Sequence, residues 1–555
     1  MVWSVLSECV LQQIMLQLDL HDRFTSAALV CTAWQQAAVA ATQHLVITPP
    51  SATVTKLQGV LAWLHTPHQL TGLELHGGHG IPIAALPCPQ LQYLALDSFK
   101  VQLTPRGTFP GLLHAATALT YLALLRVTVL GGSQQLTALS VLTDLQQLVL
   151  SELQEPSLQY AALPSSLLPH LLQITHLQIV CGLSDAALAH LGALTSLQHL
   201  QLERLGADTT PAALEPLSCL QHLTGLWLEG AHFTFEAYSN SPSSSASNSS
   251  SSSSRRPPAS LTALRSLQLH ACNGIEPEVL GPLTALESLQ LKLTPVEGAA
   301  EGAASFLSLL SRLQHLTELE LHAALPHAVT SPCSAYSALT ASSKLQSLRL
   351  SALCMPAAAW QWVFPVGGLR GQQLAHLTHV RLSYCEPPLS ADGLKGLARC
   401  AGVRSLALHA PLQHLHAVDA STALQQLSSL TELSISHVGD EWTSHVLAAL
   451  TGLSALMIVQ PSSVTDVGVL QLTALQQLSS LWVASEGLSK ELCTSGTRGI
   501  LQLVSLAFAR IIHGAASMQY DTIEQAYRCD YRCLSSTRHA LVIVCCSFMG
   551  MHRMH

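Results

Sequence analysis

Two arginines in the second half of the chain have a residue type and a spacing that could bind an anion. Arg349 and Arg381 occupy the same place in consecutive copies of a short leucine-rich phrase, and Glu320 has that place in the copy before them. If each copy forms one strand of a parallel sheet, the three side chains lie side by side at strand spacing. Neighbouring guanidinium groups repel each other unless an anion lies between them, and their forked donors suit carboxylate or phosphate. The spacing therefore predicts a site for an acidic or phosphorylated protein segment. The alternative is that Glu320 and solvent neutralise the two arginines.

Aromatic side chains in the same phrase form a second group that could bind a partner. Tyr93 and Tyr121 share its third position in neighbouring copies, and Trp227 and Trp482 have its fifth position. Exposed aromatic residues and arginine are the usual anchors of protein interfaces. We expect a protein partner to contact these aromatic residues and the charged row: Tyr93, Tyr121, Trp227, Glu320, Arg349, Arg381 and Trp482.

Other residues that could do chemistry lack a catalytic or metal-binding spacing. The 28 histidines recur in repeat contexts such as LQHL and LTHV, which biased composition explains better than metal binding. The chain has no His-Glu-x-x-His, no P-loop and no Gly-x-Gly-x-x-Gly motif, and HGGHG at 76–80 has no matching lysine or helix start. Cys529 and Cys533, with Cys545 and Cys546, are spaced too irregularly for a standard zinc site. We expect a non-catalytic protein with no cofactor and no metal.

Composition and charge limit the classes of partner. Only 10% of the 555 residues are charged, against about 25% in a typical soluble domain, and the net charge is −8. This balance argues against nucleic acid or an anionic membrane as a partner bound mainly by charge. No uninterrupted apolar run reaches the roughly 18 residues that a membrane span needs. The start of the chain lacks the basic region of a signal peptide, and the 15 cysteines are scattered and odd in number. We expect a soluble protein of the cytoplasm or nucleus with reduced thiols.

The phrase Leu-x-x-Leu-x-Leu, with conservative replacements, organises most of the chain. Successive copies start 21 to 32 residues apart, except for one step of 41 residues that contains a serine-rich tract at 238–258. We interpret that tract as a disordered insertion, because it has too little apolar surface to offset its ordering entropy. Ser184 and Asp185, and later Thr465 and Asp466, predict helix starts after two of the strands. The copies start at Leu70, Leu91, Leu119, Leu145, Ile174, Leu197, Leu223, Leu264, Leu286, Leu316, Leu345, Leu377, Val403, Leu430, Leu453, Leu478 and Leu503.

On these copies, residues 70–508 resemble a leucine-rich-repeat solenoid. Two copies resemble the cysteine-containing subtype, with Cys385 and Cys272 at its characteristic position, and the others lack both that cysteine and the asparagine ladder of other subtypes. The resemblance implies an α/β fold that is curved, with short parallel strands on the concave face and helices on the convex face. Residues 42–69 would then connect to and cap the solenoid, and residues 509–555 form a C-terminal tail or cap.

The first forty residues do not follow the repeat. Two helices are predicted, with apolar residues on one face of the first and with LVCTAW near the end of the second. The segment 3–41 resembles the F-box, an all-α module, although Ser7 stands where proline is usual and the part after Asp22 is one residue longer. Serine can cap the same helix start. The matching positions are Leu6, Val10, Leu11, Ile14, Leu18, Asp22, Leu29, Val30, Cys31 and Trp34.

The F-box resemblance implies a function and a partner. In that family, such positions dock on the Skp-type adaptor of cullin–RING ubiquitin ligases, here Leu6, Val10, Leu11, Ile14, Leu18, Leu29, Val30 and Trp34. The chain would then be the substrate-recognition subunit, with its repeats binding the client protein. The alternative is a leucine-rich-repeat scaffold or sensor whose first helices only cap the first repeat, because solenoid ends need covering.

Overall fold

The computed structural model describes residues 8–17, 34, 37–38, 42–47, 70–77, 82–83, 88–103, 113, 116–155, 163–181, 183–205, 216–230, 261–272, 280–293, 302–322, 332–365, 374–410, 415–459 and 464–483. They fall into two compact units, Met1–Ile275 and Glu276–His555, called unit 1 and unit 2 here. The serine-rich tract, the last phrase from Leu503 and the tail 509–555 lie outside the described residues.

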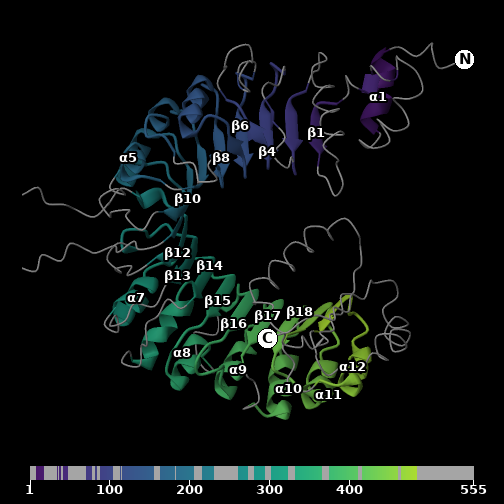
Figure 1. The fold of residues 1–555 in the computed structure, drawn as a ribbon. Coiled ribbons are helices and arrows are strands. Elements are labelled where there is room, and N and C mark those ends of the chain that lie inside the picture. Colours follow the sequence, from purple (N-terminus) through teal and green to yellow (C-terminus); the bar gives the residue numbers. More distant parts are fainter. Residues whose placement is uncertain are drawn as a thin grey trace, which may run out of the picture. The chain divides into compact units, whose positions relative to one another are not determined.

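Unit 1 contains a row of parallel strands, one for each phrase from Leu70 to Leu264, and one further strand before them (Figure 1). The further strand, β1, pairs in parallel with β2. Thr42 is its buried first-position residue, where other copies have leucine, and the phrase pattern therefore missed this strand. The strands are β1 (His44–Ile47), β2 (Gly72–Leu75), β4 (Tyr93–Asp97), β6 (Tyr121–Leu125), β8 (Gln147–Ser151), β9 (His176–Val180), β10 (His199–Leu205), β11 (Gly225–Gly230) and β12 (Ser266–Cys272).

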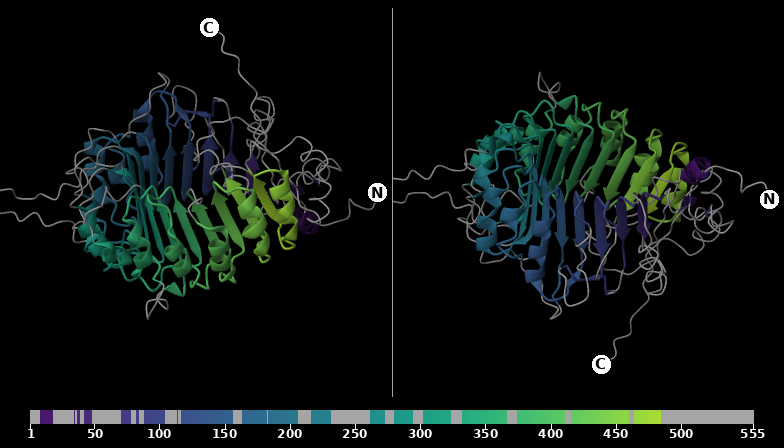
Figure 2. Two further views of the ribbon diagram at one scale, coloured as in Figure 1. Left: turned by 90° about the horizontal axis from the view of Figure 1, so that it is seen from below. Right: turned by 90° about the horizontal axis from the view of Figure 1, so that it is seen from above.

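Unit 2 repeats this plan, with one parallel strand for each phrase from Leu286 to Leu478 and with helical segments between consecutive strands (Figure 2). Neighbouring helices, such as α9 and α10, also pack against each other. The strands are β13 (Ser288–Leu293), β14 (Glu318–His322), β15 (Ser347–Ser351), β16 (His379–Ser383), β17 (Ser405–His409), β18 (Glu432–Ser436), β19 (Ala455–Val459) and β20 (Ser480–Val483). The α-helices are α7 (Gly302–Leu310), α8 (Trp360–Val363), α9 (Ala391–Leu397), α10 (Ala417–Gln425), α11 (Asp440–His445) and α12 (Asp466–Gln471).

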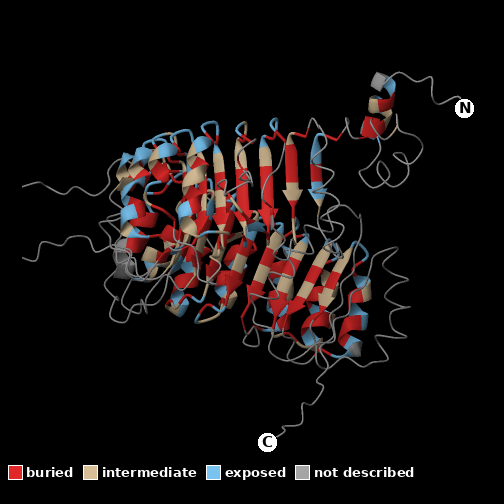
Figure 3. Ribbon diagram, turned by 45° about the horizontal axis from the view of Figure 1, so that its top comes forward, coloured by how far each residue is buried: buried red, intermediate tan, exposed pale blue. Residues whose placement is uncertain are grey.

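The leucines of the phrase form the core of each unit. In β15, for example, Leu348 and Leu350 are 0% exposed, whereas Arg349 between them is partly exposed. Figure 3 shows this alternation of buried and partly exposed residues along the strands. Burying one leucine contributes roughly 1.5–3 kcal/mol, so each strand gains stability only when its neighbours cover it. The predicted leucine-rich-repeat architecture, a long parallel sheet with apolar positions inward, is therefore present in both units.

A row of hydroxyl side chains links consecutive strands at the second position of the phrase. Thr71 Oγ1 donates to the backbone oxygen of Gln43 at 3.1 Å, and Thr317 Oγ1 donates to that of Glu287 at 2.9 Å. The same carbonyl also accepts two backbone N–H groups, as Gln43 does from Thr71 and Gly72. The other hydroxyls of this kind belong to Thr120, Thr175, Thr224, Thr378, Thr431, Ser454 and Ser479.

In nine copies, the eighth position of the phrase adopts a left-handed conformation at or near the end of the strand. Eight non-glycine residues there have φ between 51° and 66°, and Gly77 has the same place after β2 with φ 67°. A left-handed conformation costs a non-glycine residue roughly 1–2 kcal/mol, so the surrounding hydrogen bonds must hold it. The N–H of Ala352, for example, donates to the carbonyl of Ser383 at 2.8 Å. The eight residues are Ser98, Arg126, Glu152, Arg204, Ala271, Ala352, Tyr384 and His437.

In several copies, the ninth position, where the asparagine ladder was absent from the sequence, is apolar and buried. Phe99, Val127 and Leu353 are all 0% exposed. Cys385 has this position in its copy and is buried, with its Sγ near the carbonyl oxygen of Leu350 at 3.6 Å. Burial raises the pKa of the Cys385 thiol to about 12, so the side chain packs as a neutral thiol.

Helical segments connect the strands of unit 2, and in unit 1 they are described between β6 and β12. Between β2 and β8, the side away from the main strands has a second parallel sheet of β3 (Pro82–Ile83), β5 (Lys100–Val101) and β7 (Thr128–Val129), followed by the 3-10 helix Ser133–Val141. From the sequence, only helices were predicted between the main strands, and these short strands were not predicted. Their β-branched residues, such as Val101 and Val129, are favoured in strands.

The two predicted helix starts have different outcomes. In α5 (Asp185–Ala189), Ser184 is the N-cap and its Oγ accepts from the N–H of Ala187 at 3.3 Å, as predicted. Thr465 is the residue before α12, but its side chain makes no capping bond. Its hydroxyl donates instead to Asp440 Oδ2 at 2.6 Å, so it links α12 to α11.

Candidate functional site

Unit 2 has a groove of about 290 Å³ on its strand face. Third-, fifth- and seventh-position side chains line it, because these positions alternate with the buried leucines. We call this the unit 2 groove. Its polar and aromatic lining consists of Arg349, His379, Arg381, Ser405, His409, Glu432, Ser434, Ser480 and Trp482.

The predicted charged row lies at one end of this groove. Strand register pairs Glu320 with Arg349 and Arg349 with Arg381, which confirms the predicted adjacency. Arg349 Nη1 donates to Glu320 Oε2 at 3.1 Å, and both side chains are more than a third exposed. Arg381 Nε donates to Ser383 Oγ at 3.4 Å. Glu320 therefore balances part of the positive charge, although an exposed ion pair of this kind contributes only about 0–1 kcal/mol.

A buried histidine forms the floor of the groove beside the arginines. His409 is 3% exposed, and its Nε2 lies 2.7 Å from Ser434 Oγ while its Nδ1 lies 3.2 Å from Ser383 Oγ. A serine beside an imidazole can act as a nucleophile when a carboxylate orients the other ring nitrogen. Here Ser383, and not a carboxylate, contacts the other ring nitrogen. The two serines therefore fix the orientation of the imidazole ring, and Ser434 presents its hydroxyl to a ligand.

Beyond the arginines, the groove contains an acid and, at its other end, an aromatic ring. Glu432 lies at the third position of β18, between Ser405 and Ala455 in the register, and has no ion pair among the described residues. Trp482 lies two strands farther along, next to Met457 in the register, and is partly exposed. The groove therefore has positive side chains at one end and a negative one toward the other.

Unit 1 has a larger groove of about 440 Å³, which we call the unit 1 groove. No lysine, arginine, aspartate or glutamate lines it among the described residues. Its His176 and His199 rings are stacked with centroids 4.5 Å apart, and burial together with the charge of His199 lowers the pKa of His176. The indole of Trp227 packs against His270, with centroids 5.4 Å apart. The polar and aromatic lining is Tyr121, Gln147, His176, Gln178, His199, Gln201, Trp227, Ser266 and Gln268.

The two predicted tyrosines form a stack beside the unit 1 groove. Register pairs Tyr93 with Tyr121, and their rings are nearly parallel, 7° apart, with centroids 4.2 Å apart. Burial and a hydrogen bond with Glu74 raise the pKa of Tyr93, which therefore stays a neutral donor. The predicted adjacency is confirmed, whereas binding to a partner stays a prediction.

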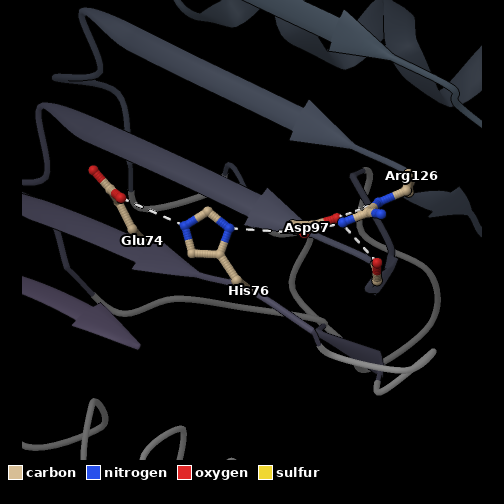
Figure 4. A network of polar contacts seen from close by, with 5 residues as sticks. Glu74, His76, Asp97 and Arg126 are labelled. Carbon is tan, nitrogen blue, oxygen red and sulfur yellow. Dashed lines mark hydrogen bonds and ion pairs between the residues drawn. The ribbon is translucent and has the colours of Figure 1, made fainter. Parts of the chain in front are cut away.

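A network of charged groups joins the first strands of unit 1 (Figure 4). His76 lies between two carboxylates, with its Nε2 3.5 Å from Glu74 Oε2 and its Nδ1 3.7 Å from Asp97 Oδ2. Arg126 donates to both oxygens of Asp97, with Nε 2.8 Å from Oδ1. Burial raises the pKa of Asp97, but the hydrogen bonds from Arg126 and Ser98 and the nearby positive charges outweigh it, so the pKa lies below its usual value.

This network has a structural role, because its charged groups contact one another. Among the described residues, no group of three or more histidine, cysteine, aspartate or glutamate side chains could hold a metal ion. The network was not predicted from the sequence, because its members have the fifth, seventh and eighth positions in different copies. Glu432 and His409 were not predicted either, although a comparison of the third and seventh positions along the repeats would have shown them.

The predicted adaptor-binding residues are only partly described. In α1 (Glu8–Gln17), Leu11 is 2% exposed and Ile14 is partly buried, whereas Val10 is 45% exposed. Trp34 is partly buried and helical. The remaining predicted positions lie outside the described residues: Leu6, Leu18, Leu29 and Val30. Within the described part of the chain, no helix is long and apolar enough to cross a membrane.

Comparisons with known proteins give only a general likeness. No family model and no curated protein matches the chain. Among solved structures, it is similar to an internalin from Listeria monocytogenes, at 14% identity over 79% of this chain and 84% of that one, with a TM-score of 0.29. It is also similar to the leucine-rich-repeat ectodomain of the Arabidopsis receptor kinase HAESA in complex with a peptide hormone, at 16% identity over 79% and 71% of the two chains, with a TM-score of 0.37. At such values, the architecture rests on the strands and leucines described above.

Proposed function

We propose that this chain is a non-catalytic protein-interaction scaffold that binds protein ligands on the strand faces of its two units. The observation that carries this proposal is the groove on each face, lined by side chains that the leucine core does not use. Neighbouring strands hold these side chains at fixed spacing, so a ligand meets a preformed surface and few groups must be ordered on binding. Aromatic residues and arginine in such a surface suit the centre of a protein interface.

A blocking substitution tests this proposal. Ala407 lies between Arg381 and Ser434 in the register, so Ala407→Trp should fill the unit 2 groove without removing a core leucine. Val418→Trp is the matched control, because Val418 on α10 is 75% exposed and lies outside the groove lining. We expect proteins captured by the wild-type chain, measured by quantitative mass spectrometry, to be lost with Ala407→Trp and kept with Val418→Trp. Equal capture by all three chains would contradict binding in this groove.

We also propose a more specific role, the substrate-recognition subunit of a cullin–RING ubiquitin ligase in the cytoplasm or nucleus. Its support is the F-box-like order of residues 3–41 before the repeats, together with an α1 that leaves Val10 exposed beside the buried Leu11. A Skp-type adaptor would then hold the first helices while the repeats hold the client, which raises the effective concentration of client lysines near the ubiquitin carrier.

The adaptor itself is the probe for this role. The full chain should capture a purified Skp-type adaptor, whereas a chain without residues 1–41, or one with Leu29→Asp and Trp34→Asp, should not. Because each repeat contacts mainly its neighbours, the deletion should leave most of the repeats folded. Failure of the full chain to bind any such adaptor would leave the scaffold proposal in place and remove the ligase role.

A further inference from the structure

We propose that the unit 2 groove recognises an extended, phosphorylated protein segment that carries a basic residue three or four positions from its phosphorylated residue. Arg349 and Arg381 would hold the phosphate, and Glu432 would hold the basic side chain. This inference rests on the proposed function, because it takes the ligand of the groove to be a protein.

The phosphate subsite follows from the side chains around Ala407. This small residue leaves a hollow between Arg381 on one neighbouring strand and Ser434 on the other. His409 lies at the floor of the groove, and its Nε2 is 2.7 Å from Ser434 Oγ. The histidine therefore fixes the serine hydroxyl at the edge of this hollow. Guanidinium groups and a hydroxyl together supply donors for the three terminal oxygens of a phosphate.

The charge of Glu320 favours a phosphate over a second carboxylate. Glu320 already gives Arg349 one carboxylate at 3.1 Å, so the three groups of the row carry a net charge of about +1. A ligand carboxylate would compete with Glu320 on nearly equal terms. A phosphate ester carries about −1.5 to −2 charges and can bridge both guanidinium groups.

The basic subsite follows from Glu432 and its neighbours. Ala455 on β19 and Ser405 on β17 flank Glu432 in the register, and neither provides a cation. Trp482 at the end of the groove can pack against the stem or the charge of a lysine or arginine. A basic side chain above Ala455 would therefore meet a carboxylate and an aromatic ring.

Strand spacing sets the separation of the two subsites. Arg381 on β16 and Glu432 on β18 are two strands apart, about 9.6 Å at roughly 4.8 Å per strand, and two residues apart along the strands, about 6.6 Å at roughly 3.3 Å per residue. Their backbone positions are therefore separated by about 12 Å. An extended peptide advances about 3.3 Å per residue, so three to four residues span this distance. A peptide that crosses the strands would place its phosphate and its basic residue in the two subsites in one of the two sequence orders.

Fluorescence anisotropy with labelled nine-residue peptides and the full chain tests the proposal. The probes carry phosphoserine and lysine three or four residues apart, in both orders, in an alanine–glycine–serine background. We expect one of these peptides to bind at least about tenfold more tightly than its unphosphorylated form and than the form with lysine replaced by glutamate. Arg381→Glu should weaken binding about tenfold or more. Arg399→Glu is the matched control, because Arg399 is exposed outside the groove lining, and it should bind as the wild type does.

A charge exchange separates recognition from misfolding. Glu432→Lys should lose the lysine peptide and gain the glutamate peptide, a reversal that an unfolded variant could not produce. Equal binding of phosphorylated and unphosphorylated peptides, or no reversal with Glu432→Lys, would overturn the inference. If no peptide binds while proteins are still captured by the wild type and lost with Ala407→Trp, the inference is wrong and the scaffold proposal stands. If Ala407→Trp also leaves capture unchanged, both fail for this groove.

Discussion

The two strand faces share one backbone plan and present different chemistry. The unit 1 groove is lined by glutamine, histidine and aromatic side chains, whereas the unit 2 groove has two arginines toward one end and Glu432 toward the other. In both units the leucines of the phrase are buried, so the residues between them vary without loss of the core. The side chains that line each groove therefore come from positions that contribute little to the leucine core.

The two units also differ in where their charged side chains lie. In unit 1 the charged groups join one another at the ends of the first strands, where Arg126 and His76 both meet the buried Asp97. In unit 2 the arginines and Glu432 line the groove itself. The charged groups at the strand ends of unit 1 therefore bind one another, whereas the arginines and Glu432 of unit 2 line the groove in which we propose that a ligand binds.

The largest expected effect tests whether the two units share one kind of core. Leu122→Ala in unit 1 and Leu348→Ala in unit 2 remove side chains that are 0% exposed. Each should cost about 2–5 kcal/mol in the free energy of unfolding, measured by chemical denaturation. Hydrogen exchange should rise mainly in the unit that carries the change, because repeats contact their neighbours. An equal rise in both units would contradict this separation.

A smaller effect tests whether charge stabilises unit 1. Asp97→Asn should cost about 1–2 kcal/mol, because it removes a bidentate pair with Arg126 from a buried carboxylate. Since folding lowers the pKa of Asp97, its contribution is present above its unfolded pKa of about 3.9 and is lost as the pH falls through the folded pKa. As the pH decreases below about 4, the free energy of unfolding of Asp97→Asn should therefore fall less than that of the wild type.

Acid denaturation curves of wild type, Asp97→Asn and Asp144→Asn measure this difference. Asp144 is an exposed aspartate of the same unit and serves as the matched control. An acid transition of Asp97→Asn that superimposes on that of the wild type would show that the Asp97 pair does not stabilise unit 1.

The hydroxyl row should contribute equally to both units. Thr120→Val in unit 1 and Thr317→Val in unit 2 each remove one hydrogen bond to the preceding strand. We expect each to cost about 0.5–1.5 kcal/mol in thermal or chemical unfolding. A cost in only one unit would show that the strands of the two units are held differently.

The smallest effect concerns the left-handed eighth position. Ala352 has φ 51°, so Ala352→Gly should relieve strain and stabilise unit 2 by about 0.5 kcal/mol, after the greater freedom of glycine in the unfolded chain is subtracted. Ala359 has φ −67°, and Ala359→Gly should destabilise the same unit. If chemical unfolding showed that both substitutions raise the free energy of unfolding, or that both lower it, strain at Ala352 would be contradicted.

Much of the strand arrangement could be predicted from the sequence. The phrase located every strand from β2 to β20 in the main rows and predicted the register of Glu320, Arg349 and Arg381. It missed β1, where Thr42 stands in place of leucine, and the strands β3, β5 and β7 that follow β2, β4 and β6, because each is only two residues long.

The sites were harder to predict for a physical reason. The contact of Arg126 with Asp97 depends on the left-handed turn at Arg126, and that of His409 with Ser434 depends on the seventh position of one strand facing the fifth of the next. Such contacts join different positions of different copies, so a comparison of one position at a time does not reveal them.

Site-specific photo-crosslinking tests most directly whether the strand faces bind proteins. A photoreactive residue is placed at Ala407 in the unit 2 groove or at Val418 on α10, and the full chain is irradiated in its native cells. We predict a discrete covalent adduct from position 407 that is absent from position 418. Adducts from position 418 and none from position 407 would contradict the account and assign binding to the helical side.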